Sequence, residues 1–313
     1  GNDLYSDCFH NPSSDDPEQR PDVASDEISE TIDSAAGACA ETVTDKKGRY
    51  TLDEITDHGQ SRCNDLVRPC DIKGILHSHT RWTDGAHSLE SMVDTAREIG
   101  LEYLGISDHF KSEMHTDGLD VKAAEIQREE IDRLREKYDD FDILQGIEVD
   151  ADGAGNLLVD EDHLDMFEFV IVSFPENGGY QPADFVPRVV KVAKHPKVTI
   201  LGNPVGDLML RGCEAMIQME AVLEAAAEHG TAVELNANPN SHKLEWTCCR
   251  MAQEKGVHLV ISPNAHRAAR LVDYRHGAEL AHDAGLNCGS IINTMCADRL
   301  RHHIEHGFKN GRA

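Results

Sequence analysis

The chain has 313 residues, and its 57 acidic and 30 basic side chains give a formal net charge of −27. This charge argues against broad electrostatic binding to nucleic acid or to an anionic membrane, because both attract basic surfaces. No apolar run approaches the roughly 20 residues that a membrane-spanning helix needs, and the nine cysteines include no CxxC pair, so neither a membrane protein nor a secreted disulfide framework is expected.

Residues 1–45 are rich in Asp, Glu, Ser, Pro and Ala, and Arg20 is their one Lys or Arg. They show no apolar periodicity, which is typical of a segment that cannot build a core. The first residues do not resemble a signal peptide, which with reduced cysteines favours a cytoplasmic protein. We expect an acidic, largely irregular extension over residues 1–70 and one folded domain over residues 71–313.

From residue 71 onward, short apolar runs alternate with amphipathic segments. The predicted strands are residues 72–76, 103–107, 143–149, 169–173, 198–202, 232–236 and 258–262, with a weaker eighth at 290–293. Between them, helical spacing appears over residues 89–99, 126–134 and 219–226, and Gly100 and Gly230 stand where a helix should stop. Repeated strand–helix units predict a parallel sheet, either open or closed into a barrel.

Polar residues follow several of these strands. His77 and His79 end the first strand and point to the same side if the segment is extended. Asp108 and His109 end the second strand, Glu148 and Asp150 end the third, and Asn264 and His266 follow the seventh. Taken singly, Asp108 could cap a helix, His109 could be a satisfied buried histidine and Glu148 could face solvent. Together they favour a metal centre at the carboxyl ends of the strands, where β/α barrels carry their active sites.

The segment HSHTRWTDGAHSLESMVDTAREIGLEYLGISDHF resembles the opening of the PHP family, the polymerase and histidinol phosphatase domains. QGIEVD, ELNANP and GVHLVISPNAHR resemble later motifs of that family, and the module attached to bacterial family X DNA polymerases is the most similar form. The likeness spans about residues 71 to 300. It implies an α/β protein with a distorted (β/α)7 TIM-like barrel, which holds up to three divalent metals and hydrolyses phosphoesters.

The resemblance also implies a ligand set. His77 and His79 match a pair that holds one metal with Glu148 and a late aspartate, whose position is taken here by Asn264. Glu148 also matches a bridge to a second metal. The ligands of the third metal, which are also the expected catalytic residues, match Asp84, His109 and His266. Lys111 and Arg267 follow two of these ligands and are either contacts for a substrate phosphate or ordinary surface residues.

Three positions depart from the family pattern. Pro175 and Asn203 stand where the second metal would have histidines, and Asn264 replaces an aspartate. Proline has no donor atom, and an amide oxygen is a weaker ligand for a hard cation than a carboxylate. We therefore expect fewer than three divalent ions per chain, of Zn, Mn or Fe. The weaker candidates to replace the missing histidines are His163, His195 and His242.

Two functions follow from this reading. The first is a metal-dependent phosphoesterase with a reduced site, which hydrolyses a phosphomonoester, a nucleotide or a DNA end weakly. The alternative is a non-catalytic PHP-like module that binds metal, phosphate or another protein. Both readings predict a phosphorylated small molecule or nucleotide as partner, no broad nucleic-acid surface and no membrane, and the sequence makes no prediction of the oligomeric state.

Overall fold

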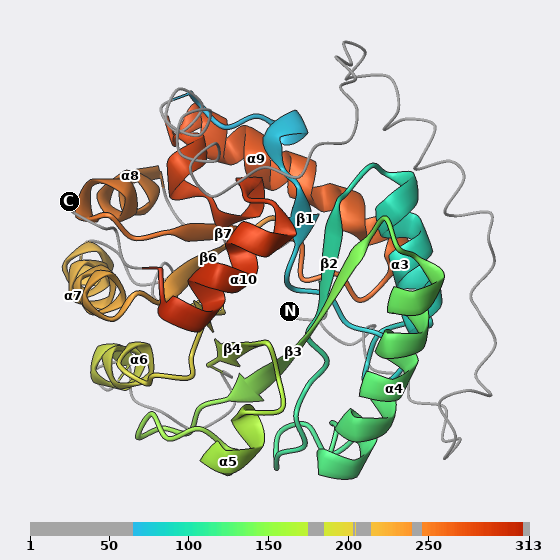
Figure 1. The fold of residues 1–313 in the computed structure, drawn as a ribbon. Helices are drawn as coiled ribbons and strands as arrows, with labels where there is room; N and C mark the ends of the chain where they lie inside the picture. Colours follow the sequence, from blue (N-terminus) through green and yellow to red (C-terminus); the bar gives the residue numbers. More distant parts are fainter. Residues whose placement is uncertain (1–64, 175–184, 203, 205–213, 240–245, 309–313) are drawn as a thin grey trace, which may run out of the picture.

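The computed structural model describes residues 65–174, 185–202, 204, 214–239 and 246–308. Its seven parallel strands lie in one sheet in the order of the sequence, and the sheet curves into a nearly closed barrel (Figure 1). The strands are β1 (Gly74–Ile75), β2 (Tyr103–Ile106), β3 (Asp142–Asp150), β4 (Phe169–Ser173), β5 (Ile200–Leu201), β6 (Ala232–Asn236) and β7 (Leu259–Ser262). The predicted (β/α)7 TIM-like barrel is confirmed. Residues 1–64 lie outside the described residues, so the acidic extension and its boundary stay predictions.

The eighth predicted strand is wrong. Two short 3-10 helices, η7 (Cys288–Ser290) and η8 (Ile292–Thr294), lie on either side of Ile291, which makes a single parallel bridge with Leu259 of β7. The buried Asn293 side chain fills the gap between β1 and β7: its Nδ2 donates to the carbonyls of Gly74 and Ile261 at 2.9 and 3.0 Å, and its Oδ1 accepts from the Ile261 amide at 2.6 Å. The apolar run is therefore buried because it closes the barrel, although it forms no strand.

Helices cover the outside of the barrel. α3 (Leu89–Glu98) and α4 (Val121–Lys137) lie on one side, and α6 (Phe185–Ala193), α7 (Glu214–His229) and α8 (Trp246–Lys255) lie on the opposite side (Figure 1). Further helical segments in the described part of the chain include η2 (Pro69–Asp71), α5 (Glu161–Leu164), η6 (Ala268–Asp273) and α9 (Tyr274–Asp283). Gly100 and Gly230 follow α3 and α7 with φ of 86° and 74°, so both predicted helix stops are confirmed.

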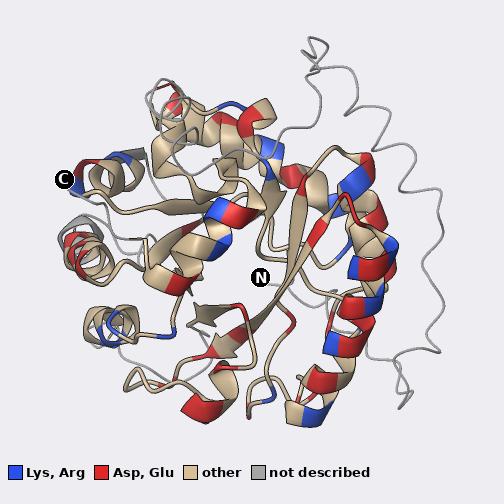
Figure 2. Ribbon diagram, viewed as in Figure 1, with Lys and Arg blue, Asp and Glu red and all other residues tan. Residues whose placement is uncertain are grey.

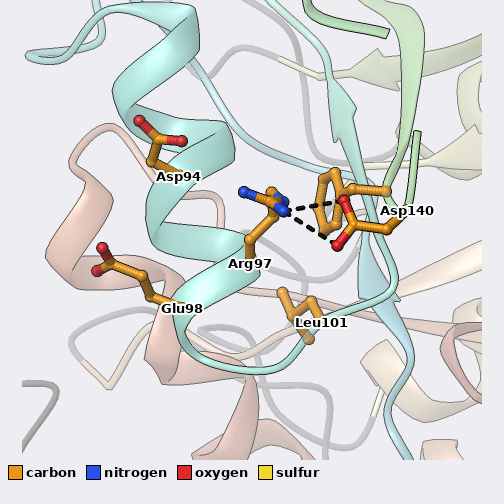
Figure 3. Close-up of a pocket in the computed structure, with 6 residues that line it drawn as sticks. Asp94, Arg97, Glu98, Leu101 and Asp140 are labelled. Atoms are coloured by element: carbon orange, nitrogen blue, oxygen red, sulfur yellow. Dashed lines mark hydrogen bonds and ion pairs between the residues drawn. The ribbon is translucent and has the colours of Figure 1, made fainter. Parts of the chain in front are cut away.

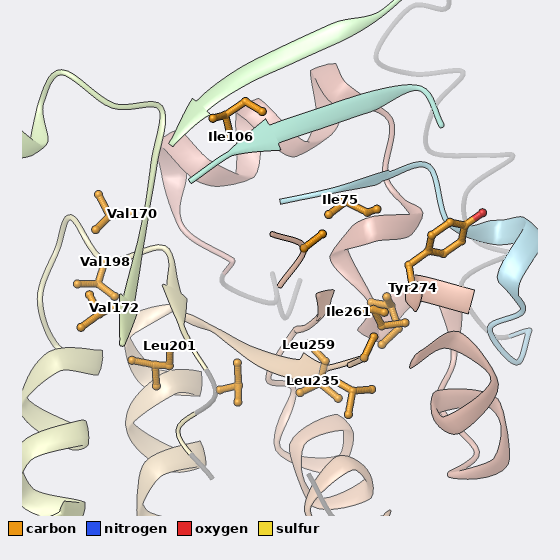
Figure 4. Close-up of a cluster of buried hydrophobic side chains, with 14 of the residues drawn as sticks. Ile75, Ile106, Val170, Val172, Val198, Leu201, Leu235, Leu259, Ile261 and Tyr274 are labelled. Carbon is orange, nitrogen blue, oxygen red and sulfur yellow. The ribbon is translucent and has the colours of Figure 1, made fainter. Parts of the chain in front are cut away.

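The barrel has an outer and an inner core. Outward side chains such as Val170, Val172 and Leu259 pack under the helices (Figure 4). Inward side chains, among them Leu76, Leu144 and Phe169, form the inner core. The last helix, α10 (Ala297–His306), lies across this inner core and adds Leu300 to it (Figure 1). α10 therefore closes the base of the barrel.

Strand β3 shows how the barrel changes from apolar to polar along its axis. Its inward positions are Leu144, Gly146, Glu148 and Asp150, from the base toward the mouth. A Cβ on Gly146 would come within 2.2 Å of the Phe169 ring, so glycine is needed there to admit the aromatic side chain. Because the residues nearer the base are packed, the Glu148 carboxylate lies at the bottom of the open end of the barrel, which we call the mouth.

The outer surface of the helices α3 and α4 carries many charged side chains. Acidic and basic residues are mixed along α4 (Figure 2), where Arg135 pairs with Asp132 at 3.0 Å. A shallow polar pocket of about 300 Å³ lies between α3 and the start of β3, and the Arg97 guanidinium donates to both carboxylate oxygens of Asp140 across it (Figure 3). None of the helices in the described part of the chain is long and apolar enough to cross a bilayer.

Candidate metal centre

The first cluster of ligand-type side chains is His77, His79 and Glu148. A ring nitrogen of each histidine approaches the same Glu148 Oε2, at 3.2 Å for His77 and 3.3 Å for His79. The three side chains are at most 6% exposed. Two backbone hydrogen bonds hold the segment His77–His79 against Ala265. The His79 amide donates to the Ala265 carbonyl at 2.9 Å, and the Ala265 amide donates to the His77 carbonyl at 3.3 Å. The side chains of His77 and His79 therefore point to the same side of the segment, as their spacing predicts.

The second cluster is His79, Asp84, His109 and His266, and one ligand atom from each lies within 4.8 Å of the others. Asp84 Oδ2 is 2.9 Å from His266 Nε2 and 3.6 Å from His109 Nε2, and Asp84 Oδ1 is 3.6 Å from His79 Nδ1. Because His79 belongs to both clusters, six of the seven residues expected to hold metal, all but Asn264, meet at the mouth of the barrel.

Asp108 supports the loop that carries Asp84. It is fully buried and accepts hydrogen bonds from the Thr80 amide and hydroxyl at 2.8 and 2.7 Å and from the Thr83 hydroxyl at 2.6 Å. The alternative role for Asp108, a cap on the next helix, is excluded because Asp120 caps α4 through the Ala123 amide. Asp108 instead fixes the turn that brings Asp84 to the histidines.

Glu234 is a site residue that the sequence reasoning did not single out. It lies on β6, is 1% exposed, and its Oε2 accepts a 2.6 Å hydrogen bond from His77 Nδ1. Metal-binding histidines commonly donate their second ring nitrogen to a carboxylate in this way, which fixes the tautomer and the ring orientation. The signal was its place in a strand, two residues before the strand end, where a buried glutamate needs a partner.

His115 and Asp150 form a second pair that was not assigned a role. His115 Nδ1 donates to Asp150 Oδ2 at 2.8 Å, and Asp150 also accepts from the hydroxyls of Ser112 and Ser173 at 2.6 and 3.2 Å. The His115 ring stacks on His109, with centroids 3.7 Å apart. No sequence spacing indicated this, because His115 lies in the irregular loop between β2 and α4.

The electrostatics of the clusters favour a bound positive charge. Burial would raise the pKa of Glu148, but the His109 and His77 imidazoles lower it well below its usual value. Burial would lower the pKa of His77, but Glu234 and Glu148 raise it to about 10. Burial, followed by His266 and His109, holds the pKa of His79 well below its usual value. The shared ligand is thus neutral, as metal binding requires, and the carboxylates around it attract a cation.

The donor set fits a metal. Within the part of the chain that the structure describes, both ring nitrogens of His79 are buried without a hydrogen bond. His109 Nδ1 and Asn264 Oδ1 are also buried and have no hydrogen bond. Buried polar atoms rarely lack partners, and a cation would satisfy these lone pairs. Imidazole and carboxylate ligands suit Zn, Mn and Fe. Asn264 has a left-handed backbone with φ of 47°, and its role as a ligand stays a prediction.

The remaining predicted residues have less support. Lys111 and Arg267 are exposed next to His109 and His266, and their contact with a substrate stays a prediction. Pro175, Asn203 and His242 lie outside the described residues. His163 faces Phe110, with ring centroids 6.2 Å apart, and His195 lies 3.4 Å from Glu161, and neither belongs to the two clusters.

Comparison with known proteins places the site in context. The model of the PHP domain family matches residues 76–238. The chain is 31% identical over 245 residues to the DNA polymerase/3'-5' exonuclease PolX of Bacillus subtilis, covering 77% of this chain but only 43% of that protein. It is 24% identical over 250 residues to a "Probable phosphatase" of Caldanaerobacter subterraneus subsp. tengcongensis, covering 75% of this chain and 92% of that protein.

A solved structure supports the fold. The crystal structure of histidinol phosphate phosphatase from Lactococcus lactis, complexed with Zn, L-histidinol and phosphate, matches with a TM-score of 0.55 and 17% identity. The match covers 69% of this chain and 94% of that one. At this identity the likeness concerns the barrel alone.

Proposed function

The chain belongs to the PHP domain family, and on that premise we propose that it is a metal-dependent phosphoesterase that acts on phosphomonoesters of small molecules or nucleotides. The family assignment and the barrel agree with the relatives, and the His and carboxylate clusters are those of this chain. The proposal adds the reaction, the substrate class and a centre of two cations rather than three. The expected location is still the cytoplasm, because the cysteine pattern favours reduced thiols.

The observation that carries the proposal is the position of Glu148 Oε2. It lies 3.2, 3.3 and 3.4 Å from ring nitrogens of His77, His79 and His109, which come from both clusters. One carboxylate between two sets of imidazoles is the arrangement that a pair of neighbouring cations requires. A centre that served structure alone would be closed, whereas Asp84 and His266 are 43% and 38% exposed at the mouth.

The chain's own residues hold and shape such a centre. Bound divalent ions would lower the pKa of a water molecule and stabilise the charge on the phosphoryl oxygens. Glu234 holds the His77 ring, and Asp108 fixes the loop of Asp84. Lys111 and Arg267 are the exposed cations next to two ligands and are proposed to contact the phosphate. The names of the relatives, a polymerase/exonuclease and phosphatases, agree with phosphoester substrates.

The second candidate is a PHP-like module that binds metal or phosphate without turnover. The presence of Asn264 and Pro175, where the family pattern has a carboxylate and a histidine, favours it. An amide in place of a carboxylate leaves one more uncompensated positive charge on the cations, and proline removes a ligand.

Turnover and metal content separate the two candidates. The chain is stripped of metal, loaded with Zn²⁺, Mn²⁺ or Fe²⁺, and assayed on p-nitrophenyl phosphate, bis(p-nitrophenyl) phosphate and L-histidinol phosphate. We expect hydrolysis of the monoesters with about two metal equivalents held at the mouth of the barrel, and a loss of about 100-fold or more in kcat/KM in His109→Ala and His266→Ala. His195→Ala, outside the clusters, is the control. Metal binding without turnover would select the second candidate, and absence of both would overturn the two proposals.

A further inference from the structure

We propose that His302 and His306 on α10 form a surface site for a borderline transition metal ion such as Zn²⁺, Ni²⁺ or Cu²⁺. The two histidines lie on the helix that closes the base of the barrel, whereas the candidate centre described above lies at the mouth (Figure 1). The site is therefore separate from the proposed phosphoesterase centre and does not depend on it.

The spacing and geometry of the pair suit chelation. Residues four apart on an α-helix are neighbours on one face, and the ring centroids of His302 and His306 are 4.3 Å apart, with planes 30° from parallel. Both residues are exposed. Two imidazoles at this separation can donate to one ion with a small change of side-chain torsion. Imidazole pairs bind Zn²⁺, Ni²⁺ and Cu²⁺ in preference to Mg²⁺ or Ca²⁺.

The tautomer of His306 points its second nitrogen outward. His306 Nδ1 donates to the His302 carbonyl at 2.8 Å. A neutral imidazole that donates from Nδ1 keeps its lone pair on Nε2. Donation of the other ring nitrogen to a backbone carbonyl is how proteins commonly orient a metal-binding histidine. The ligand atom is thus presented before any ion arrives.

The helix that carries the pair is anchored. Leu300 is fully buried in the inner core, and Arg301 pairs with Asp142 at 2.6 Å and with Glu168 at 3.5 Å. Because α10 is already held in place, binding an ion costs little ordering of the backbone.

Two acidic residues lie close to His302 and His306 on α10. Asp298 lies one helical turn before His302 and is exposed, and Glu305 is the exposed residue next to His306. Their charges, in a chain of net charge −27, favour a positive ion. The His303 ring packs against His258 and Phe308, with centroids 6.3 and 5.7 Å away, and lies edge-on to the His302 ring at 6.0 Å. His303 is therefore not part of the proposed ligand set. An ion bound by two protein ligands keeps water in its other positions.

A metal on this face would hold the last turn of α10 and thereby stabilise the closed base. An ion that binds the folded chain and not the unfolded chain raises stability in proportion to the logarithm of its concentration over its dissociation constant. The unfolded chain does not fix the two rings at this separation, so it should bind the ion more weakly at this pair. Nickel should therefore raise the melting temperature through this site as well as through any ion held at the mouth.

The test compares the full chain with the double variant His302→Ala/His306→Ala by equilibrium dialysis against Ni²⁺ and by thermal unfolding. We expect the double variant to bind one equivalent less and to lose part of the Ni²⁺-induced rise in melting temperature. Either single variant should weaken that equivalent by about tenfold or more, which is about 1.4 kcal/mol. Hydrolysis of p-nitrophenyl phosphate should be unchanged.

The controls separate this site from others. His229→Ala removes an exposed histidine at the end of α7 that has no histidine one turn away, and it should bind as many equivalents as the wild type. His302→Gln/His306→Gln keeps polar side chains on the helix and should lose the same equivalent as the alanine variant. Equal stoichiometry and equal Ni²⁺ response in the wild type and in both folded double variants would overturn the proposal.

Discussion

The His115 ring stacks on the His109 ring with centroids 3.7 Å apart and planes 9° from parallel. His109 approaches Asp84 and Glu148 at 3.6 and 3.4 Å, so one face of a candidate ligand is covered by a residue that belongs to neither cluster. Asp150 accepts a hydrogen bond from His115 Nδ1 at 2.8 Å. The orientation of His109 thus depends on a loop residue as well as on the end of β2.

The first prediction concerns this stack. His115→Ala should lower metal affinity about tenfold, because the His109 ring gains freedom when its neighbour is removed. His115→Phe should retain most of the affinity, because a benzyl ring keeps the stacked face. Metal titration followed by dialysis measures both values, and Met114→Ala, an exposed change in the same loop, is the control. Equal affinities for His115→Ala and the wild type would show that the stack has no role.

The second prediction concerns Glu234. Glu234→Gln keeps the shape but removes the negative charge that accepts from His77 Nδ1. We expect metal affinity and kcat/KM for p-nitrophenyl phosphate to fall about 10- to 100-fold, the usual cost of losing such a partner. Glu228→Gln changes an exposed glutamate of α7 and should leave both values unchanged. A variant with normal metal affinity would limit Glu234 to a structural role.

The sequence predicted some of these features and missed others for physical reasons. β4 and β6 were predicted to their observed bounds, because each is a continuous buried run between polar segments. The segment at 290–293 has the same apolar signal, but Asn293 needs a bent backbone to reach two strands at once. Burial is visible in one stretch of sequence, whereas the backbone path that achieves it depends on distant partners.

The same distinction applies to the site. His77, His79, Asp84, His109, Glu148 and His266 could be named because they follow strands and match family motifs. Glu234 could not be linked to its partner, because it lies 157 positions from His77 and the contact forms only when the barrel closes. The ring stack of His115 depends on a loop that has no periodic pattern. The candidate ligands were therefore more predictable than the residues that orient them.

The third prediction concerns closure of the barrel. Asn293→Ala should destabilise the fold by about 2–4 kcal/mol, because it leaves buried backbone groups of Gly74 and Ile261 without partners. Urea unfolding followed by circular dichroism measures the change. Asn287→Ala is the matched control, because Asn287 bonds through its backbone: its amide donates to Gln253 and its carbonyl accepts from the Ser290 amide. A loss below about 0.5 kcal/mol, the range of ordinary surface changes, would contradict the bridging role.

The last prediction concerns pH and a histidine at the base of the barrel. His258 is 7% exposed and packs against the rings of His303 and Phe308, 6.3 and 5.7 Å away between centroids. Burial, followed by the charges of His303 and Arg299, lowers the pKa of His258 to about 4, although a hydrogen bond with the Phe308 backbone opposes this. In the unfolded chain its pKa returns to about 6.5. At a pH between these two pKa values, His258 is protonated in the unfolded chain and neutral in the folded chain.

The sign follows from that difference in protons bound. The free energy of unfolding should fall as pH drops from about 6.5 to about 4, and His258 alone should contribute up to about 3 kcal/mol of the loss. His258→Gln cannot take up this proton, so its unfolding free energy should change less over the same range. Urea unfolding at pH 7.5, 6, 5 and 4.5 with EDTA present measures the two slopes, and His229→Gln serves as the exposed control. The slope of the wild type should exceed that of His258→Gln and equal that of His229→Gln. Parallel slopes for the wild type and His258→Gln would mean that His258 accepts a proton in the folded chain as readily as in the unfolded one.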